Sequence, residues 1–164
     1  MTPPPLTRRR VVQISMAACC CGGKTLGAPS PGPRIDQITD PRATAATNMF
    51  RFAPDLVVTS PGTEITFLNS RGEHTVHSVP QLWPEGVDQV GIRAQKEAGV
   101  RLSAPGLYGF RCQRHGKYGM VMLVVAGEAP KLDDVAERIA AMTAGMREKA
   151  AFANLIERYR DQNG

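Results

Sequence analysis

The sequence predicts a mainly β protein, a Greek-key sandwich or barrel with two α-helices after its last strand. Two observations support this fold class. Between residues 48 and 127, short β-prone runs alternate with turns such as Ser60-Pro61-Gly62 and Pro105-Gly106, a spacing typical of antiparallel sandwiches. After Gly127, apolar residues recur at the three- and four-residue spacing of amphipathic helices. A chain of 164 residues is long enough to bury a hydrophobic core in one such domain.

Residues 1–28 have the composition of an export signal. Three arginines at positions 8–10 precede a short apolar stretch, Ile14–Cys21, which is too short to cross a bilayer as a mature helix. The arginines are similar to a twin-arginine export signal, which predicts a periplasmic protein. Cleavage before Cys19, as in lipoproteins, would leave a membrane anchor at that residue. Simple cleavage near Gly27-Ala28 is the alternative.

The net charge of +5 lies mostly in this leader. Residues 1–28 hold four of the 20 basic residues and none of the 15 acidic ones, so the rest of the chain has 16 basic and 15 acidic residues. This balance removes the main support for a nucleic-acid-binding protein. Three of the four cysteines also fall in the leader, so the cysteine count predicts no internal disulfide framework.

Residues 29–47, rich in Gly, Pro, Ala and Thr, predict a linker with a weak edge strand near Arg34–Thr39. The main domain is expected over residues 48–127. Its connection over residues 80–98 has no clear strand pattern. Alternation and β-branched content predict its strands within Met49–Val58, Glu64–Asn69, His74–Ser78, Val100–Ser103, Leu107–Cys112 and Met120–Ala126.

Residues 128–164 predict a helical extension packed on the sandwich. Apolar residues recur at helical spacing from Leu132 to Met142 and again from about Met146 to Arg160, with Gly145 as the break between them. We expect the apolar stripes of both helices to cover one sheet.

A Cys-x2-His-x4-Met spacing joins Cys112, His115 and Met120 between two apolar segments, and His74 supplies a second imidazole. A thiolate and two imidazoles, with a weak thioether on the axis, are the ligands of a blue-copper centre. Met120 stands at the rim of the loop and is predicted as the axial ligand, whereas Met122 is assigned to the core.

A zinc site is the rival interpretation of the same residues. His74 and His77 could combine with Cys112 and His115 in a closed tetrahedral site of one thiolate and three imidazoles. If His74 and His77 lie in one strand, their side chains point to opposite faces, because alternate residues of a strand share a face. Copper bound by His74, Cys112, His115 and Met120 is therefore favoured.

At these residues the chain resembles the small blue-copper proteins, the cupredoxins, and within them the pseudoazurins. The Cys112–Met120 loop has the length shared by pseudoazurin and plastocyanin, and Ala104–Cys112 is similar to the pseudoazurin run before its copper cysteine. The stretch Trp83–Gly86 is similar to a loop of that family. Two positions depart from the family pattern, with Thr75 where Asn is usual and Arg114 where Pro is usual.

This resemblance implies a cupredoxin fold and a periplasmic, monomeric one-electron carrier with one type 1 copper ion, rather than an enzyme. His115 would be the exit for the electron. A basic rim of Arg111, Arg114 and Lys117, extended by Arg71, would dock redox partners such as a nitrite reductase, a nitrous-oxide reductase or a cytochrome.

Two other function classes can be weighed from the same residues. A multicopper oxidase activates oxygen at several coppers bound by His-x-His pairs, and the three histidines of this chain are too few to build them. A copper storage or delivery protein is the remaining alternative, although one Cys among imidazoles fits poorly with fast metal exchange.

Overall fold

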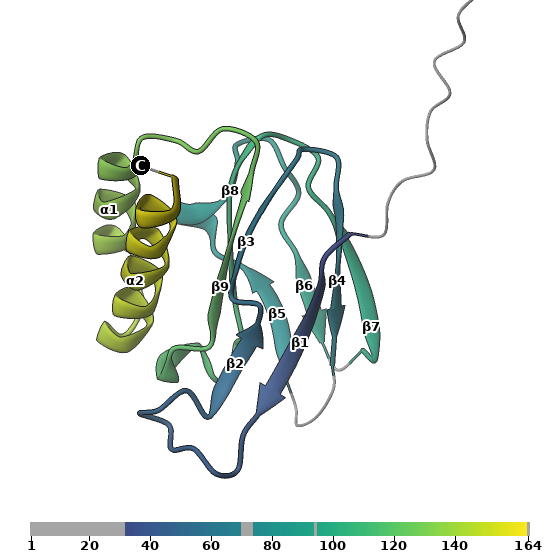
Figure 1. Ribbon diagram of the computed structural model, residues 1–164, viewed down its shortest axis with the longest axis vertical. Helices are drawn as coiled ribbons and strands as arrows, with labels where there is room; N and C mark the ends of the chain where they lie inside the picture. The colour runs from purple at the N-terminus through teal and green to yellow at the C-terminus, as the bar shows by residue number, and fades with distance from the viewer. Residues whose placement is uncertain (1–31, 70–73, 94, 164) are drawn as a thin grey trace, which may run out of the picture.

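The computed structural model describes residues 32–69, 74–93 and 95–163, and these residues form a two-sheet β-sandwich with two helices against one side (Figure 1). The predicted fold class is confirmed. The export signal with Cys19, and Arg71 of the expected basic rim, lie outside the described residues. No helix of the described part of the chain is long and apolar enough to span a membrane.

The first sheet has the strand order β2-β1-β4-β7 and the second has the order β3-β9-β8-β5-β6. The strands of the first sheet are β1 (Arg34–Thr39), β2 (Phe50–Ala53), β4 (Glu64–Leu68) and β7 (Glu97–Arg101). Those of the second sheet are β3 (Leu56–Thr59), β5 (Thr75–Ser78), β6 (Gly91–Arg93), β8 (Gly106–Arg111) and β9 (Val121–Ala126). Short 3-10 helices, η1 (Pro80–Leu82) and η2 (Gly116–Tyr118), interrupt the loops.

The strand Arg34–Thr39 was expected at an edge, and the structure corrects this. β1 lies between β2, with which it pairs antiparallel, and β4, with which it pairs parallel. Only Ile35 and Gln37 of this strand are buried, so its sequence resembles an edge strand. The strands that pair with β1 lie later in the sequence, so the residues of β1 alone do not reveal that it has a neighbour on each side. The sandwich therefore begins at Arg34 rather than near residue 48.

The β-prone run Met49–Val58 forms two strands in different sheets. β2 ends at Ala53, a cis peptide bond joins Ala53 to Pro54, and β3 then starts in the second sheet beside β9. β3 pairs parallel with β9, as β1 does with β4. Each sheet is thus mixed, not purely antiparallel as the turn pattern suggested, because strands that cross between the sheets return in the same direction.

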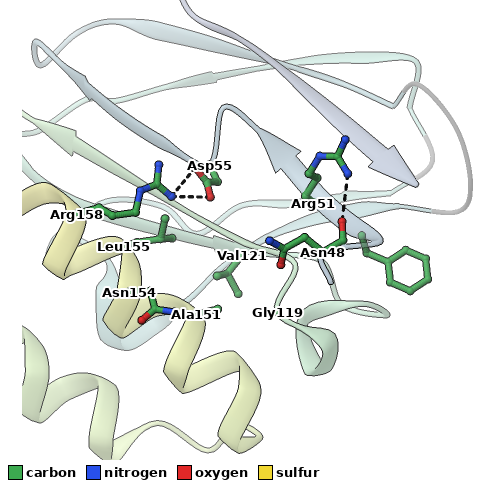
Figure 2. Close-up of a pocket in the computed structure, with 10 residues that line it drawn as sticks. Asn48, Arg51, Asp55, Gly119, Val121, Ala151, Asn154, Leu155 and Arg158 are labelled. Carbon is green, nitrogen blue, oxygen red and sulfur yellow. Dashed lines mark hydrogen bonds and ion pairs between the residues drawn. The ribbon is translucent and has the colours of Figure 1, made fainter. Parts of the chain in front are cut away.

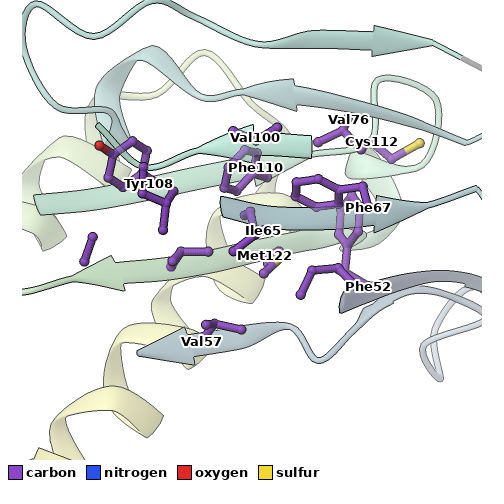
Figure 3. Close-up of a cluster of buried hydrophobic side chains, with 14 of the residues drawn as sticks. Phe52, Val57, Ile65, Phe67, Val76, Val100, Tyr108, Phe110, Cys112 and Met122 are labelled. Carbon is purple, nitrogen blue, oxygen red and sulfur yellow. The ribbon is translucent and has the colours of Figure 1, made fainter. Parts of the chain in front are cut away.

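The main core lies between the two sheets and ends at the copper-site cysteine predicted from the sequence. Phe52 and Phe67 of the first sheet pack edge to face against each other, and Phe67 contacts Phe110 of β8. Figure 3 shows Tyr108 at one end of this cluster and Cys112 at the other. The tightly packed aromatic layer holds β8 in place, so the residue that follows this strand is rigidly positioned.

The helices α1 (Leu132–Ala141) and α2 (Met146–Asn163) cover the outer face of the second sheet, as predicted. Val135 and Ile139 of α1 and Phe152, Leu155 and Ile156 of α2 pack with alternate residues of β9 in a second hydrophobic cluster. All six residues of β9 are buried, since the first core covers one face and the helices cover the other.

Candidate metal centre

Three potential metal ligands converge at one end of the sandwich. His74 precedes β5, Cys112 follows β8, and His115 lies in the loop between β8 and β9. The Nδ1 atoms of the two histidines are 3.1 Å apart, and Cys112 Sγ lies 3.6 Å from His115 Nδ1. The ligand atoms of all three residues lie within 4.8 Å of one another.

The loop from Cys112 to Met120 is closed by its own backbone hydrogen bonds. The Cys112 N–H donates to Met120 O at 3.1 Å, and the Gly116 N–H donates to Cys112 O at 2.8 Å. Gly119 has a φ of 96°, a left-handed conformation that glycine adopts without strain and that reverses the chain after η2. These bonds hold the ends of the ligand loop together.

His74 is buried, and a second residue fixes its orientation. Its Nε2 atom lies 2.9 Å from Thr39 Oγ1, so Nδ1 faces His115 and Cys112. Burial lowers the pKa of His74, which favours the neutral imidazole that a metal ion requires. Thr39, at the end of β1, is a contact that the sequence reasoning missed.

His115 is half-buried and stacks on an aromatic ring. The Phe50 ring lies parallel to its imidazole, with centroids 3.9 Å apart and an interplanar angle of 3°. Burial is the main cause that lowers the pKa of His115, followed by the neighbouring His74, Arg114 and Lys117. Phe50 was seen in the sequence only as part of a strand. Its pairing opposite Thr39 in the β1–β2 ladder brings both residues to the site.

Met120 is fully buried in the same hydrophobic cluster as Cys112, and its N–H donates to His115 O at 3.2 Å. Its backbone is thus tied to two of the three candidate ligands. The assignment of Met120 as the axial ligand stays a prediction.

His77 is not part of the metal-ligand group among the described residues. It lies three positions after His74, within β5 and opposite Arg111 of β8. Burial, Arg93 and Arg111 lower its pKa. The zinc interpretation needs His77 at the same ion, and this placement gives it no support.

The donor set fits a blue-copper ion. Metal–nitrogen bonds of ~2.0 Å allow two nitrogens on one ion to lie at most ~4 Å apart, and the 3.1 Å separation of the two Nδ1 atoms meets this limit. One soft sulfur and two imidazoles are a combination that suits copper in both oxidation states.

Arg111, which the sequence predicts in a basic rim, is paired with an acidic side chain in the structure. Its side chain forms an ion pair with Glu148 of α2, with Nη2 and Oε2 3.1 Å apart. The Glu148 side chain is only 1% exposed and that of Arg111 is 31% exposed. The sequence alone did not indicate this pairing, which arises because α2 places a buried carboxylate beside Arg111. The exposed cations on the ligand loop are Arg114 and Lys117.

Gly116, the residue after His115, lies against this ion pair. A Cβ atom at this position would be 3.2 Å from Arg111 Nε and 3.3 Å from Glu148 Oε2. The loop therefore rests directly on a buried ion pair that links it to α2.

A pocket of about 230 Å³ lies behind the loop, between the chain around Asn48, Gly119 and α2 (Figure 2). The arginines that line it are paired within the protein. Arg158 makes two hydrogen bonds to the Asp55 carboxylate, at 2.9 and 3.1 Å, and Arg51 donates to Asn48 O at 3.2 Å. Arg51 also forms an ion pair with Asp40 at 3.7 Å, so both arginines of the pocket already have an acidic partner.

The comparisons with known proteins agree with the fold and the donor set. Residues 40–127 match the family described as copper binding proteins of the plastocyanin/azurin family. The chain is 36% identical over 99 residues to a pseudoazurin of Paracoccus pantotrophus, an alignment that covers 60% of this chain and 65% of the relative. It is 40% identical over 80 residues to a pseudoazurin of Methylorubrum extorquens, covering 49% of this chain and 54% of the relative. The matches thus span less than two thirds of these relatives' lengths.

A solved structure shows the same likeness. The crystal structure of native pseudoazurin from Hyphomicrobium denitrificans superposes with a TM-score of 0.65 and 28% sequence identity, covering 77% of this chain and 97% of that one. The resemblance that the ligand-loop motifs predicted is confirmed.

Proposed function

The chain belongs to the plastocyanin/azurin family of copper-binding proteins, and on this basis we propose that it is a one-electron carrier rather than an enzyme. His74, Cys112, His115 and Met120 would hold its copper ion. The observation that carries the proposal is the convergence of the Cys112 thiol and the two histidine Nδ1 atoms on one point. Copper, when bound, supplies the Cu(I)/Cu(II) couple.

The protein's contribution is to hold these ligands in one arrangement and to exclude water from three of them. His74, Cys112 and Met120 are each at most 1% exposed. Thr39 fixes the His74 ring, Phe50 supports the His115 ring, and the loop hydrogen bonds hold Cys112 and Met120 together. Ligands held in this way move little when the charge of the site changes, which favours fast electron transfer.

His115 is the proposed exit for the electron because it is the only half-buried residue among the proposed ligands, all of which are described. Exposed Arg114 and Lys117 lie on either side of it in the sequence, and their charges would steer an acidic partner. Nitrite reductase, nitrous-oxide reductase or a cytochrome are the proposed partners, and the periplasm is the proposed compartment, supported by the export-signal composition of residues 1–28.

The test is the visible spectrum of the copper-loaded protein. We expect an intense thiolate-to-copper charge-transfer band, which Cys112→Ser should abolish while the sandwich stays folded. His74→Ala should destroy the band and His77→Ala, the matched control, should keep it, because only His74 lies in the ligand group.

Two outcomes would reject the proposal. A colourless wild type that binds zinc in preference to copper would favour the zinc site. A wild type that loses its copper to a weak chelator within seconds would favour a copper storage or delivery protein. An electron carrier that binds copper through the buried Cys112 should release the metal slowly.

A further inference from the structure

The Thr75 hydroxyl contacts two groups of the ligand loop at once. Thr75 Oγ1 accepts a hydrogen bond from the Gln113 N–H at 2.9 Å. The same oxygen lies 3.8 Å from Cys112 Sγ. One side-chain atom therefore joins the start of β5 to both the candidate sulfur ligand and the residue after it.

The hydrogen bond from Gln113 to Thr75 extends the pairing of β5 and β8 beyond the end of the backbone ladder. In the β5–β8 ladder, His77 lies opposite Arg111 and Ser78 opposite Phe110. Extending this register by two residues puts Thr75 opposite Gln113, just beyond the last paired residue of β8. At this point the side-chain hydroxyl, instead of a backbone carbonyl, accepts the Gln113 N–H, and this leaves the chain free to turn into the ligand loop.

Proton counting decides the direction of the second contact. A backbone N–H can only donate, so Thr75 Oγ1 is the acceptor toward Gln113. The hydroxyl still has its one proton, which it can donate elsewhere. A cysteine must lose its proton to bind a metal ion, and its sulfur can then only accept. The Cys112 sulfur is the acceptor within reach.

We propose that Thr75 is a positioning residue that donates its hydroxyl proton to the Cys112 thiolate and thereby favours the reduced state of the site. The inference rests on the proposed electron-carrier function. A hydrogen bond withdraws electron density from the sulfur, which weakens its donation to Cu(II) more than to Cu(I). Hydrogen bonding around the cysteine sulfur is one of the factors that set the potential of a blue-copper site.

This arrangement depends on a residue that departs from the family pattern. The pseudoazurin resemblance places Asn at this position, and an Asn side chain has its donor and its acceptor on different atoms. In Thr75 one oxygen carries both functions. The position of the Gln113 N–H therefore orients the hydroxyl that faces the sulfur.

The experiment compares wild type with Thr75→Val, which keeps the shape and removes the hydroxyl, and with Thr75→Ser, which keeps the hydroxyl. Three quantities are measured: the reduction potential, the energy of the thiolate-to-copper band, and the exchange rate of the Gln113 amide in the metal-free protein. Thr59→Val is the matched control, because the Thr59 hydroxyl contacts the Thr63 hydroxyl. Thr59 lies in β3 opposite Ala126, at the end of β9 that is far from the ligand loop.

We expect Thr75→Val to lower the potential, to move the band to longer wavelength and to speed the exchange of the Gln113 amide. The ratio of Cu(II) to Cu(I) affinity should rise about three- to tenfold, the net size expected for one ordinary hydrogen bond, or about 30 to 60 mV for one electron. Thr75→Ser and Thr59→Val should stay close to wild type.

Two results would overturn the proposal, and they are distinguishable. If Thr75→Val speeds Gln113 exchange but leaves the potential and the band unchanged, the hydroxyl serves only the backbone and the proposal is wrong. If wild type itself shows no thiolate-to-copper band, the proposed function fails and this inference fails with it.

Discussion

Replacing either partner of the Arg111–Glu148 ion pair should destabilise the metal-free protein to very different extents. Arg111→Met removes the cation and leaves a carboxylate that is 1% exposed. Breaking a buried pair in this way costs about 3–5 kcal/mol of unfolding free energy. Glu148→Gln instead leaves an arginine that is 31% exposed, and puts a neutral amide in place of the buried carboxylate. That loss should be about 1 kcal/mol.

The difference between the two variants should depend on pH. Burial raises the pKa of Glu148 above its ordinary value of 4.5, and Arg111 opposes this rise. A carboxyl group with a raised folded-state pKa stabilises the fold most below its unfolded-state pKa, and this contribution is lost as the pH rises through the folded-state pKa. In Arg111→Met the opposing charge is gone and the pKa of Glu148 rises further. Its deficit relative to wild type should therefore widen from pH 4.5 upward.

Urea denaturation of the metal-free proteins between pH 4.5 and 8 measures these differences. Arg160→Met is the control, because Arg160 pairs with Glu157 on the same helix but both are exposed, and such a pair contributes at most about 1 kcal/mol. Equal losses in Arg111→Met and Glu148→Gln, or a difference that is constant with pH, would show that Glu148 reaches solvent and would refute the reasoning.

Three further changes test other contacts of the site. Thr39→Val removes the hydrogen bond to His74 Nε2 and should weaken metal binding about 10- to 100-fold; competition with a chelator measures this, and an unchanged affinity would contradict it. Phe50→Leu removes the ring stacked on His115 and should cost at least about 0.5–1.5 kcal/mol in urea denaturation; a neutral effect would mean that the stack adds nothing to stability. Lys117→Glu should slow electron transfer to an acidic partner at low salt, and the two rates should converge at 1 M salt, where the Debye length is ~3 Å; rates that are equal and flat across the salt series would exclude steering by this residue.

The approach of Cys112 to His115 could be predicted from the sequence because its constraints are local. Cys112, His115 and Met120 lie within nine residues, so their spacing alone restricts the metal and the loop length. The contribution of β1 could not be predicted in this way. Thr39 reaches His74 only because β1 lies inside the first sheet. The residues of β1 do not indicate which strands lie beside it.

Glu148 shows the same limit for a helix. An acidic residue in the first turn of an exposed amphipathic helix is usually solvated and favourable to the helix dipole. Here the turn faces the ligand loop, so the carboxylate is buried and neutralises Arg111. Because Arg111 lies next to Cys112, this one tertiary contact also changed which cations could form the docking face.

The burial of β9 on both faces has a consequence for how the protein melts. A helical extension joined only by surface contacts could detach while the rest of a domain stayed folded. Here the same backbone supplies alternate side chains to the inter-sheet core and to the helix-facing cluster. Loss of the helices would expose half of a strand that the other core also needs, so both clusters should unfold in one cooperative transition. The helical signal and the near-ultraviolet signal of circular dichroism should therefore be lost at one common midpoint on heating. The ligand loop leads directly into β9, so its folded structure should be lost at the same temperature.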